Sequence, residues 1–177
     1  MAVAKRRTVA DRIKRLHPCE AASLWAASYT SPLRAWKACH RAAWMLWILF
    51  CAYNLKPSVE KRRRIVRCMC EMVHTSLRHT HKPSRYGFCL PPLRAAERWS
   101  KKKSTPEEVE QIAKELWASD LPEPERDYRI LTHACCAACF LPRIFGSALF
   151  TDDFYSSNFP EIIRKHFPHP PRIPLGQ

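Results

Sequence analysis

The stretch that decides the fold is AAWMLWILFCAY, residues 42–53, which is apolar without interruption. A membrane-spanning helix needs about 18 or more such residues, whereas a helix buried on nearly all sides of a core needs only about 12. The stretch therefore predicts the central helix of a helical core. Basic residues such as Arg34, Lys37 and Arg41 precede it. We expect one helix to begin at Pro32 and to become buried as it proceeds into this stretch.

The balance of glycine and proline favours helices throughout. The chain has 3 Gly and 15 Pro. So few glycines argue against a fold built from β-hairpins, and proline is well tolerated at the first position of a helix. Thr105, Pro106 and Glu108 form a capping-box pattern at such a start. We predict an all-α fold, a compact helical bundle of about six to seven helices with an aromatic-rich C-terminal wrap.

The length of 177 residues suits a single helical domain over residues 1–177. We expect a basic N-terminal arm or helix over 1–16, a second helix from Pro18 to about Tyr29, and an extended, loose, proline-rich tail over 168–177. Apolar periodicity predicts further helices over 58–79, 93–103, 106–117, 125–141 and 160–166. Residues 80–92 are expected to form a packed loop.

Nine cysteines occur, and the charged N-terminal residues lack the apolar segment of a signal peptide. We expect a reducing, cytoplasmic setting, with most thiols acting as small core residues. Cys136 and Cys139 have a spacing found in zinc sites, but the sequence offers no second such pair. Core packing is favoured over a structural metal, so neither a metal nor a cofactor is predicted.

The positive charge is concentrated in the first part of the chain. The formal net charge is +14, and residues 1–103 contribute +18 of it, from 23 Lys and Arg against 5 Asp and Glu. A field of this sign attracts polyanions, of which nucleic acid is the commonest, and an acidic protein surface would also satisfy it.

Two segments supply the candidate binding residues for nucleic acid or an acidic partner: Lys61, Arg62, Arg63, Arg64 and Arg67 in the first, Arg98, Lys101, Lys102 and Lys103 in the second. The first segment begins a helix, where each exposed cation opposes the helix dipole by about 0.3 to 1 kcal/mol. A bound anion would relieve this repulsion, although a solvated basic surface is the simpler interpretation. Trp36 and Trp99, which are flanked by cations, are the tryptophans expected to reach the surface and offer aromatic contacts to bases.

The sequence holds no GxSxG elbow, HExxH pair or glycine-rich phosphate loop. A cysteine placed near a histidine by folding, or a nuclease using His79 and His81, remains a minor alternative. No catalytic residue is predicted, and the chain is expected not to be an enzyme.

Two pairs of segments carry a resemblance: AWKAC at 35–39 with WMLW at 44–47, and LRAAERW at 93–99 with STPEE at 104–108. They resemble a loose group of small, largely uncharacterised helical proteins of phages and bacterial genomes. HACCAAC at 133–139 is similar to the closing segment of that group. The resemblance covers about half of the chain. It implies an all-helical fold and a phage or mobile-element setting, and it transfers no active site.

Two functions remain open at this point. The first is a small basic accessory protein that acts by macromolecular binding, most simply to nucleic acid or a nucleoprotein complex. The alternative is a stoichiometric protein inhibitor or immunity or anti-defence factor, phage-encoded, that docks on an acidic partner. No membrane partner is predicted, and the sequence leaves the oligomeric state open.

Overall fold

The computed structural model describes residues 8–55, 58–79, 87–118, 132, 135, 136, 139 and 158–173, and these residues form helices with no strand among them. The predicted all-α class is confirmed. The elements are α1 (Val9–Ile13), the 3-10 turn η1 (Lys14–Leu16), α2 (Glu20–Ala27), α3 (Pro32–Ala38), α4 (Ala42–Leu55), α5 (Val59–His79), α6 (Leu90–Ser100), α7 (Pro106–Ala118) and α9 (Phe159–His166). Within this part of the chain, no helix is long and apolar enough to cross a membrane.

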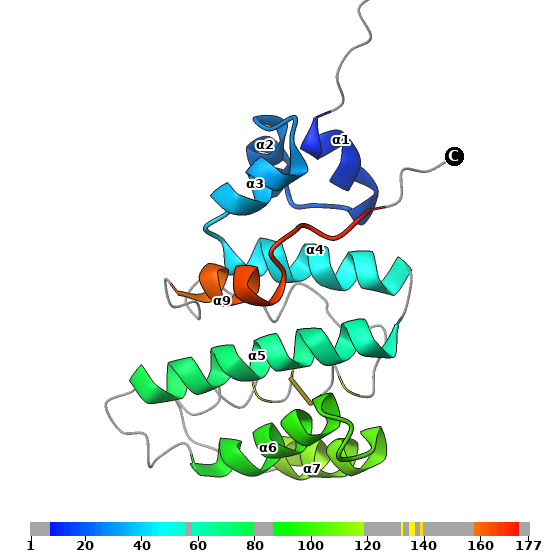
Figure 1. Ribbon diagram of the computed structural model, residues 1–177, viewed down its shortest axis with the longest axis vertical. Helices are drawn as coiled ribbons and strands as arrows, with labels where there is room; N and C mark the ends of the chain where they lie inside the picture. The colour runs from blue at the N-terminus through cyan, green and yellow to red at the C-terminus, as the bar shows by residue number, and fades with distance from the viewer. Residues whose placement is uncertain are drawn as a thin grey trace, which may run out of the picture.

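The helices are stacked in levels along the long axis of the molecule (Figure 1). Helices α1 to α3 form one end, α4 and α9 come next, α5 follows, and α6 with α7 forms the other end. Helix α9 comes from the C-terminal part of the chain, yet it packs against both α4 and α5. A helix from the C-terminal part of the chain therefore connects α4 to α5.

Helix α4 is the central helix that the apolar stretch predicts. None of its described side chains, residues 42–52, is exposed. Met45, Leu46 and Leu49 belong to the main core, while Trp47 and Cys51 pack against a second cluster formed by α1 to α3. One helix therefore contributes to two cores, which explains why it carries apolar residues on all sides.

The chain breaks between α3 and α4, where we expected one continuous helix from Pro32. Cys39 caps α3 with ψ of 117°, which is extended backbone, and α4 starts at Ala42. The break lets the N-terminal helices turn back over α4. It also brings the described part of the chain to eight α-helices, above the expected six to seven.

The C-terminal segment holds this break in place. Arg164 of α9 donates a hydrogen bond from Nη1 to the carbonyl oxygen of Cys39 at 2.8 Å. The buried indole of Trp36 donates from Nε1 to the carbonyl oxygen of Phe167, also at 2.8 Å. The sequence predicts an extended, loose tail over 168–177. The described residues beyond α9, up to 173, are neither helix nor strand, and Ile173 packs against the N-terminal cluster.

Two other helix starts test the sequence-based boundaries. Helix α6 begins at Leu90, three residues earlier than expected, because Pro91 and Pro92 fit its first turn and need not belong to the preceding loop. Helix α7 begins as predicted, since the amide of Glu108 donates to the hydroxyl oxygen of Thr105 at 3.3 Å. Of the predicted helix over 125–141, the structure describes Thr132, Cys135, Cys136 and Cys139, and all four are helical. Most of the aromatic wrap lies outside the described residues.

The cysteines are free thiols, and most are core residues, as predicted. Cys39, Cys68, Cys70, Cys89, Cys135, Cys136 and Cys139 are buried. Burial raises the pKa of Cys68, Cys136 and Cys139 well above the ordinary thiol value and that of Cys89 to about 11. These four thiols are therefore protonated at neutral pH and pack as small apolar groups.

We predict that Leu49→Ala lowers the free energy of unfolding by about 2 to 5 kcal/mol, because it opens a cavity in the centre of α4. Leu49 is fully buried, whereas 67% of Leu24 on α2 is exposed. The control Leu24→Ala should stay within about 0.5 kcal/mol of the wild type. Urea denaturation measures both, and similar losses in the two variants would contradict the central position of α4.

Candidate nucleic-acid interface

Helices α5 and α6 bring the two predicted basic segments together. Arg67 on α5 donates from Nη1 to the carbonyl oxygen of Ser100 at the end of α6, at 3.0 Å. Further along α5, Nε2 of His74 lies 2.8 Å from a carboxylate oxygen of Glu97. Later residues of α5 thus meet earlier residues of α6, so the helices run antiparallel. The C-terminal end of α6 lies beside the N-terminal half of α5.

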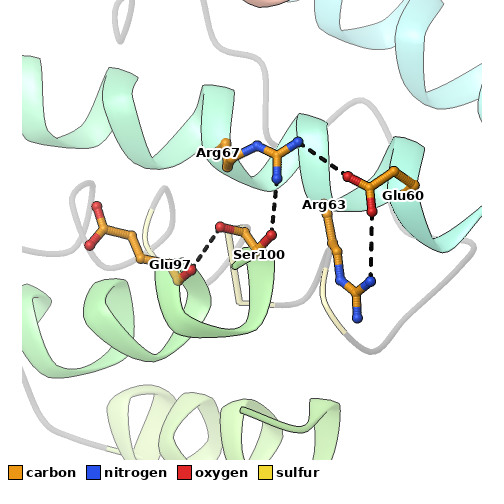
Figure 2. Close-up of polar contacts among 5 residues, drawn as sticks. All are labelled: Glu60, Arg63, Arg67, Glu97 and Ser100. Carbon is orange, nitrogen blue, oxygen red and sulfur yellow. Dashed lines mark hydrogen bonds and ion pairs between the residues drawn. The ribbon is translucent and has the colours of Figure 1, made fainter. Parts of the chain in front are cut away.

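The contacts between these helix ends are shown in Figure 2. Glu60 pairs with Arg63 at 3.7 Å and with Arg67 at 3.5 Å. The hydroxyl of Ser100 donates to the carbonyl oxygen of Glu97 at 2.7 Å. Arg67 is therefore shared between a carboxylate of its own helix and a carbonyl of the next one. Its half-buried side chain serves to join α5 to α6.

Trp99 lies beneath two arginines of α5. The guanidinium carbons of Arg62 and Arg63 lie 5.7 Å and 5.4 Å from the centre of the Trp99 ring, which is within the range of cation–π attraction. Only 1% of Trp99 and 3% of Trp36 is exposed. The prediction that these tryptophans reach the surface is wrong, because the neighbouring cations cover Trp99, and the C-terminal segment binds Trp36. Neither ring is available to stack on a base.

The packing of α6 on α5 also offsets the repulsion between the cations at the start of α5 and the dipole of that helix. The C-terminal end of a helix carries partial negative charge, and α6 ends beside Arg63 and Arg67. Together with Glu60, this end supplies counter-charge to the cations. Arg62, Arg63 and Arg67 are half-buried as a result. A bound anion is not needed to explain why these three cations stand there.

A turn of three exposed lysines follows α6, and we call Lys101–Lys103 the lysine turn. The amide of Lys103 donates to the carbonyl oxygen of Arg98 at 2.8 Å, and the amide of Lys102 donates to that of Trp99 at 3.0 Å. This is the Schellman pattern of helix ends. Lys102 has φ of 62°, a left-handed conformation that glycine adopts at much lower cost. The backbone thus holds a lysine where local stability favours glycine.

The remaining predicted cations divide into two groups. Exposed Arg98 lies next to the lysine turn, whereas Lys61 and Arg64 turn to other parts of the molecule. Arg64 lies over the ring of Phe167 at 5.0 Å, and Lys61 borders a cavity near α4. We therefore define the basic face as seven residues: Arg62, Arg63, Arg67, Arg98 and the three residues of the lysine turn. Lys61 and Arg64 are not part of it.

A polar groove of about 470 Å³ adjoins the basic face and includes Arg67 and Lys101. It continues along α5 past Glu71 and His74 to Arg78. These positions were not predicted, although Arg67, Glu71, His74 and Arg78 recur at helical spacings of four, three and four. This helical spacing is the sequence pattern that could have identified the groove. Among the described residues, no group of three His, Cys, Asp or Glu is placed to hold a metal ion.

Two histidine–carboxylate pairs lie in the groove. Nε2 of His74 is 2.8 Å from Glu97, and Nε2 of His166 is 2.8 Å from Glu71. An ionised carboxylate only accepts hydrogen bonds, so in each pair Nε2 of the imidazole is the donor. Each pair joins two helices, α5 to α6 and α9 to α5. We assign the pairs to helix packing and name no catalytic residue.

Glu71 also accepts a hydrogen bond from Nζ of Lys165 at 2.7 Å. Partial burial raises the pKa of Glu71, but hydrogen bonds and positive charge from Lys165 and His166 outweigh it, so the pKa lies below its ordinary value of 4.5. The ionised carboxylate therefore stabilises the attachment of α9 to α5.

Comparison with known proteins adds no relative: no family model, curated protein or solved structure matches the chain. The resemblance to small phage and bacterial helical proteins stays a prediction.

We predict that Glu71→Gln destabilises the protein at pH 7 and that this difference shrinks in acid. The stabilisation by Glu71 is complete above pH 4.5 and is lost as the pH falls through the lower folded-state pKa. Thermal melts at several pH values measure it. Glu110→Gln is the control, because Glu110 pairs with exposed Lys114 on a single helix, and such pairs contribute about 0.3 to 0.5 kcal/mol. A Glu71→Gln loss that is the same size at pH 3 as at pH 7 would contradict the role of ionisation.

Proposed function

We propose that the protein acts by binding nucleic acid or a nucleoprotein complex through the basic face. Four cations of this face, Arg98 and the lysine turn, are exposed, while its half-buried arginines support the helix end from which they project. Exposed lysines and arginines bind phosphates through charge and release the counterions of the nucleic acid. This mode suits a protein whose tryptophans are committed to packing, because it requires no base stacking.

The observation that carries the proposal is the left-handed lysine at position 102. Residues held in sparsely populated backbone conformations cluster at functional sites. Glycine would end α6 at lower cost but would remove the central charge of the turn. Phosphate binding supplies a reason for lysine at this position.

The polar groove supports the same proposal. Arg67, Arg78 and Lys101 place positive charge along it, and the carboxylates within it are paired with His74 and His166. A phosphate backbone that starts at the lysine turn meets further cations along α5. The proposed contacts are to phosphates, so affinity should depend strongly on salt and weakly on sequence.

The direct test is fluorescence anisotropy with labelled DNA and RNA, single-stranded and duplex, between 50 and 200 mM salt. The logarithm of the binding constant should fall linearly with the logarithm of salt concentration, by about 0.9 per phosphate contacted on duplex DNA. Lys101→Ala with Lys103→Ala should reduce this slope by about 2. Lys37→Ala on α3, an exposed lysine at the other end of the molecule, should leave it unchanged.

Absence of affinity for every probe at the lowest salt would overturn the proposal. A one-to-one protein complex that survives nuclease treatment would then favour the inhibitor hypothesis instead.

We further predict that Lys102→Gly separates stability from binding. It should raise the free energy of unfolding by about 0.5 to 1 kcal/mol, because glycine relieves the left-handed strain. It should also weaken nucleic-acid binding and lower the salt slope by about 1. Urea denaturation and the anisotropy titration measure the two effects on one preparation. Higher stability with unchanged affinity for nucleic acid would show that the lysine turn is not part of the interface.

A further inference from the structure

A second candidate site lies between the N-terminal helices, α4 and the C-terminal segment. It is a cavity of about 830 Å³, well within the range of about 300 to 1,000 Å³ that small-molecule pockets occupy. Its wall is largely apolar and includes Trp25, Trp36, Met45, Ile48 and Ile173. It is separate from the polar groove, with which it shares no lining residue.

The polar side chains that border this cavity share one sign of charge. Arg12 of α1, Lys61 of α5 and Arg172 of the C-terminal segment contribute cations, and no Asp or Glu lies among the described lining residues. Nε of Arg12 is buried without a hydrogen-bond partner within the described part of the chain. A buried guanidinium group with an unpaired donor is costly, and the negative charge of an anion in the cavity would offset this cost.

We infer that this cavity binds a single-chain amphiphile with an anionic head group. The alkyl chain would lie against the apolar wall, and the head group would accept a hydrogen bond from Arg12, with Lys61 and Arg172 adding positive charge. An apolar wall alone would suit many hydrophobic molecules, and cations alone would suit any anion. Their combination in one cavity selects a ligand that has both parts. This inference does not depend on the nucleic-acid proposal.

The first experiment titrates the full chain with cis-parinaric acid, a fluorescent fatty acid, and excites tryptophan. Trp25 and Trp36 are in the wall, so bound probe should show sensitised emission at one molecule per chain. Three competitors with the same sixteen-carbon chain then differ only in the head group: hexadecanoate, hexadecanol and hexadecyltrimethylammonium. Hexadecanoate should displace the probe at a concentration at least about tenfold below that of hexadecanol, since a charge-assisted hydrogen bond is worth about that factor. The ammonium compound should be the weakest.

A free fatty acid and a lysophospholipid offer the same chemistry, so hexadecanoyl lysophosphatidate is titrated beside hexadecanoate. Whichever of these two compounds binds more tightly identifies the preferred head group. Either result fits the inference, provided that hexadecanol is weaker than both.

Variants assign the binding to this cavity. Arg12→Gln should weaken hexadecanoate at least about tenfold while leaving hexadecanol unchanged. Arg34→Gln, at an exposed position of α3 that is outside the lining, is the matched control and should change neither. Ala52→Phe fills the cavity and should abolish binding of the probe. Ile48→Trp, from a half-buried wall position, serves the same purpose if Ala52→Phe does not fold, as judged by circular dichroism.

Equal displacement by hexadecanoate and hexadecanol would overturn the inference, because the cations would then have no role. Undiminished probe binding in a folded Ala52→Phe or Ile48→Trp variant would also overturn it, by placing the probe elsewhere.

Discussion

The structure depends on the chain break between α3 and α4 and on the two hydrogen bonds that fix it. Arg164 donates to the carbonyl of Cys39, and Trp36 donates to the carbonyl of Phe167. The last carbonyl groups of a helix have no hydrogen-bond donor within the helix, and where the helix end is buried another part of the chain must supply the donors. Here an arginine from 125 residues further along the chain supplies the donor. This contact sets the direction of the N-terminal helices and thereby forms the cavity above α4.

Elements with a local cause could be predicted from the sequence. The apolar run at 42–53 predicts a helix that is buried on all sides, and Thr105 predicts the start of α7. Both signals come from residues that are adjacent in the sequence. The break at Cys39 could not be predicted in this way. Residues 32–41 have helical spacing, and the partners of Cys39 and Trp36 come from α9 and the segment after it. The sequence does not predict the early start of α6, because a proline in a first helical turn resembles a proline in a loop.

The candidate interface was predicted in part. Charge density identified the two basic segments, but only the antiparallel packing of α5 on α6 shows which cations share a face. The cations next to Trp99 in the sequence predict an exposed ring, whereas Arg62 and Arg63 cover it. A guanidinium group packs flat on an aromatic ring, so neighbouring charge does not by itself indicate exposure. Helical spacing alone is enough to predict the polar stripe along α5.

The attachment of the C-terminal segment to the first helices has a consequence for the order in which the protein is assembled. Residue 164 bonds the residue that caps α3, residue 167 bonds α3 itself, and residue 173 packs against the N-terminal cluster. During synthesis on a ribosome these residues are the last of the described chain to emerge. The buried helix α4 is therefore made long before its α9 partner, and its apolar surface stays uncovered on one side in the meantime. Contacts of such sequence separation slow folding, and exposed apolar surface promotes association of nascent chains. A chaperone that shields α4 during translation would act at the stage of greatest risk.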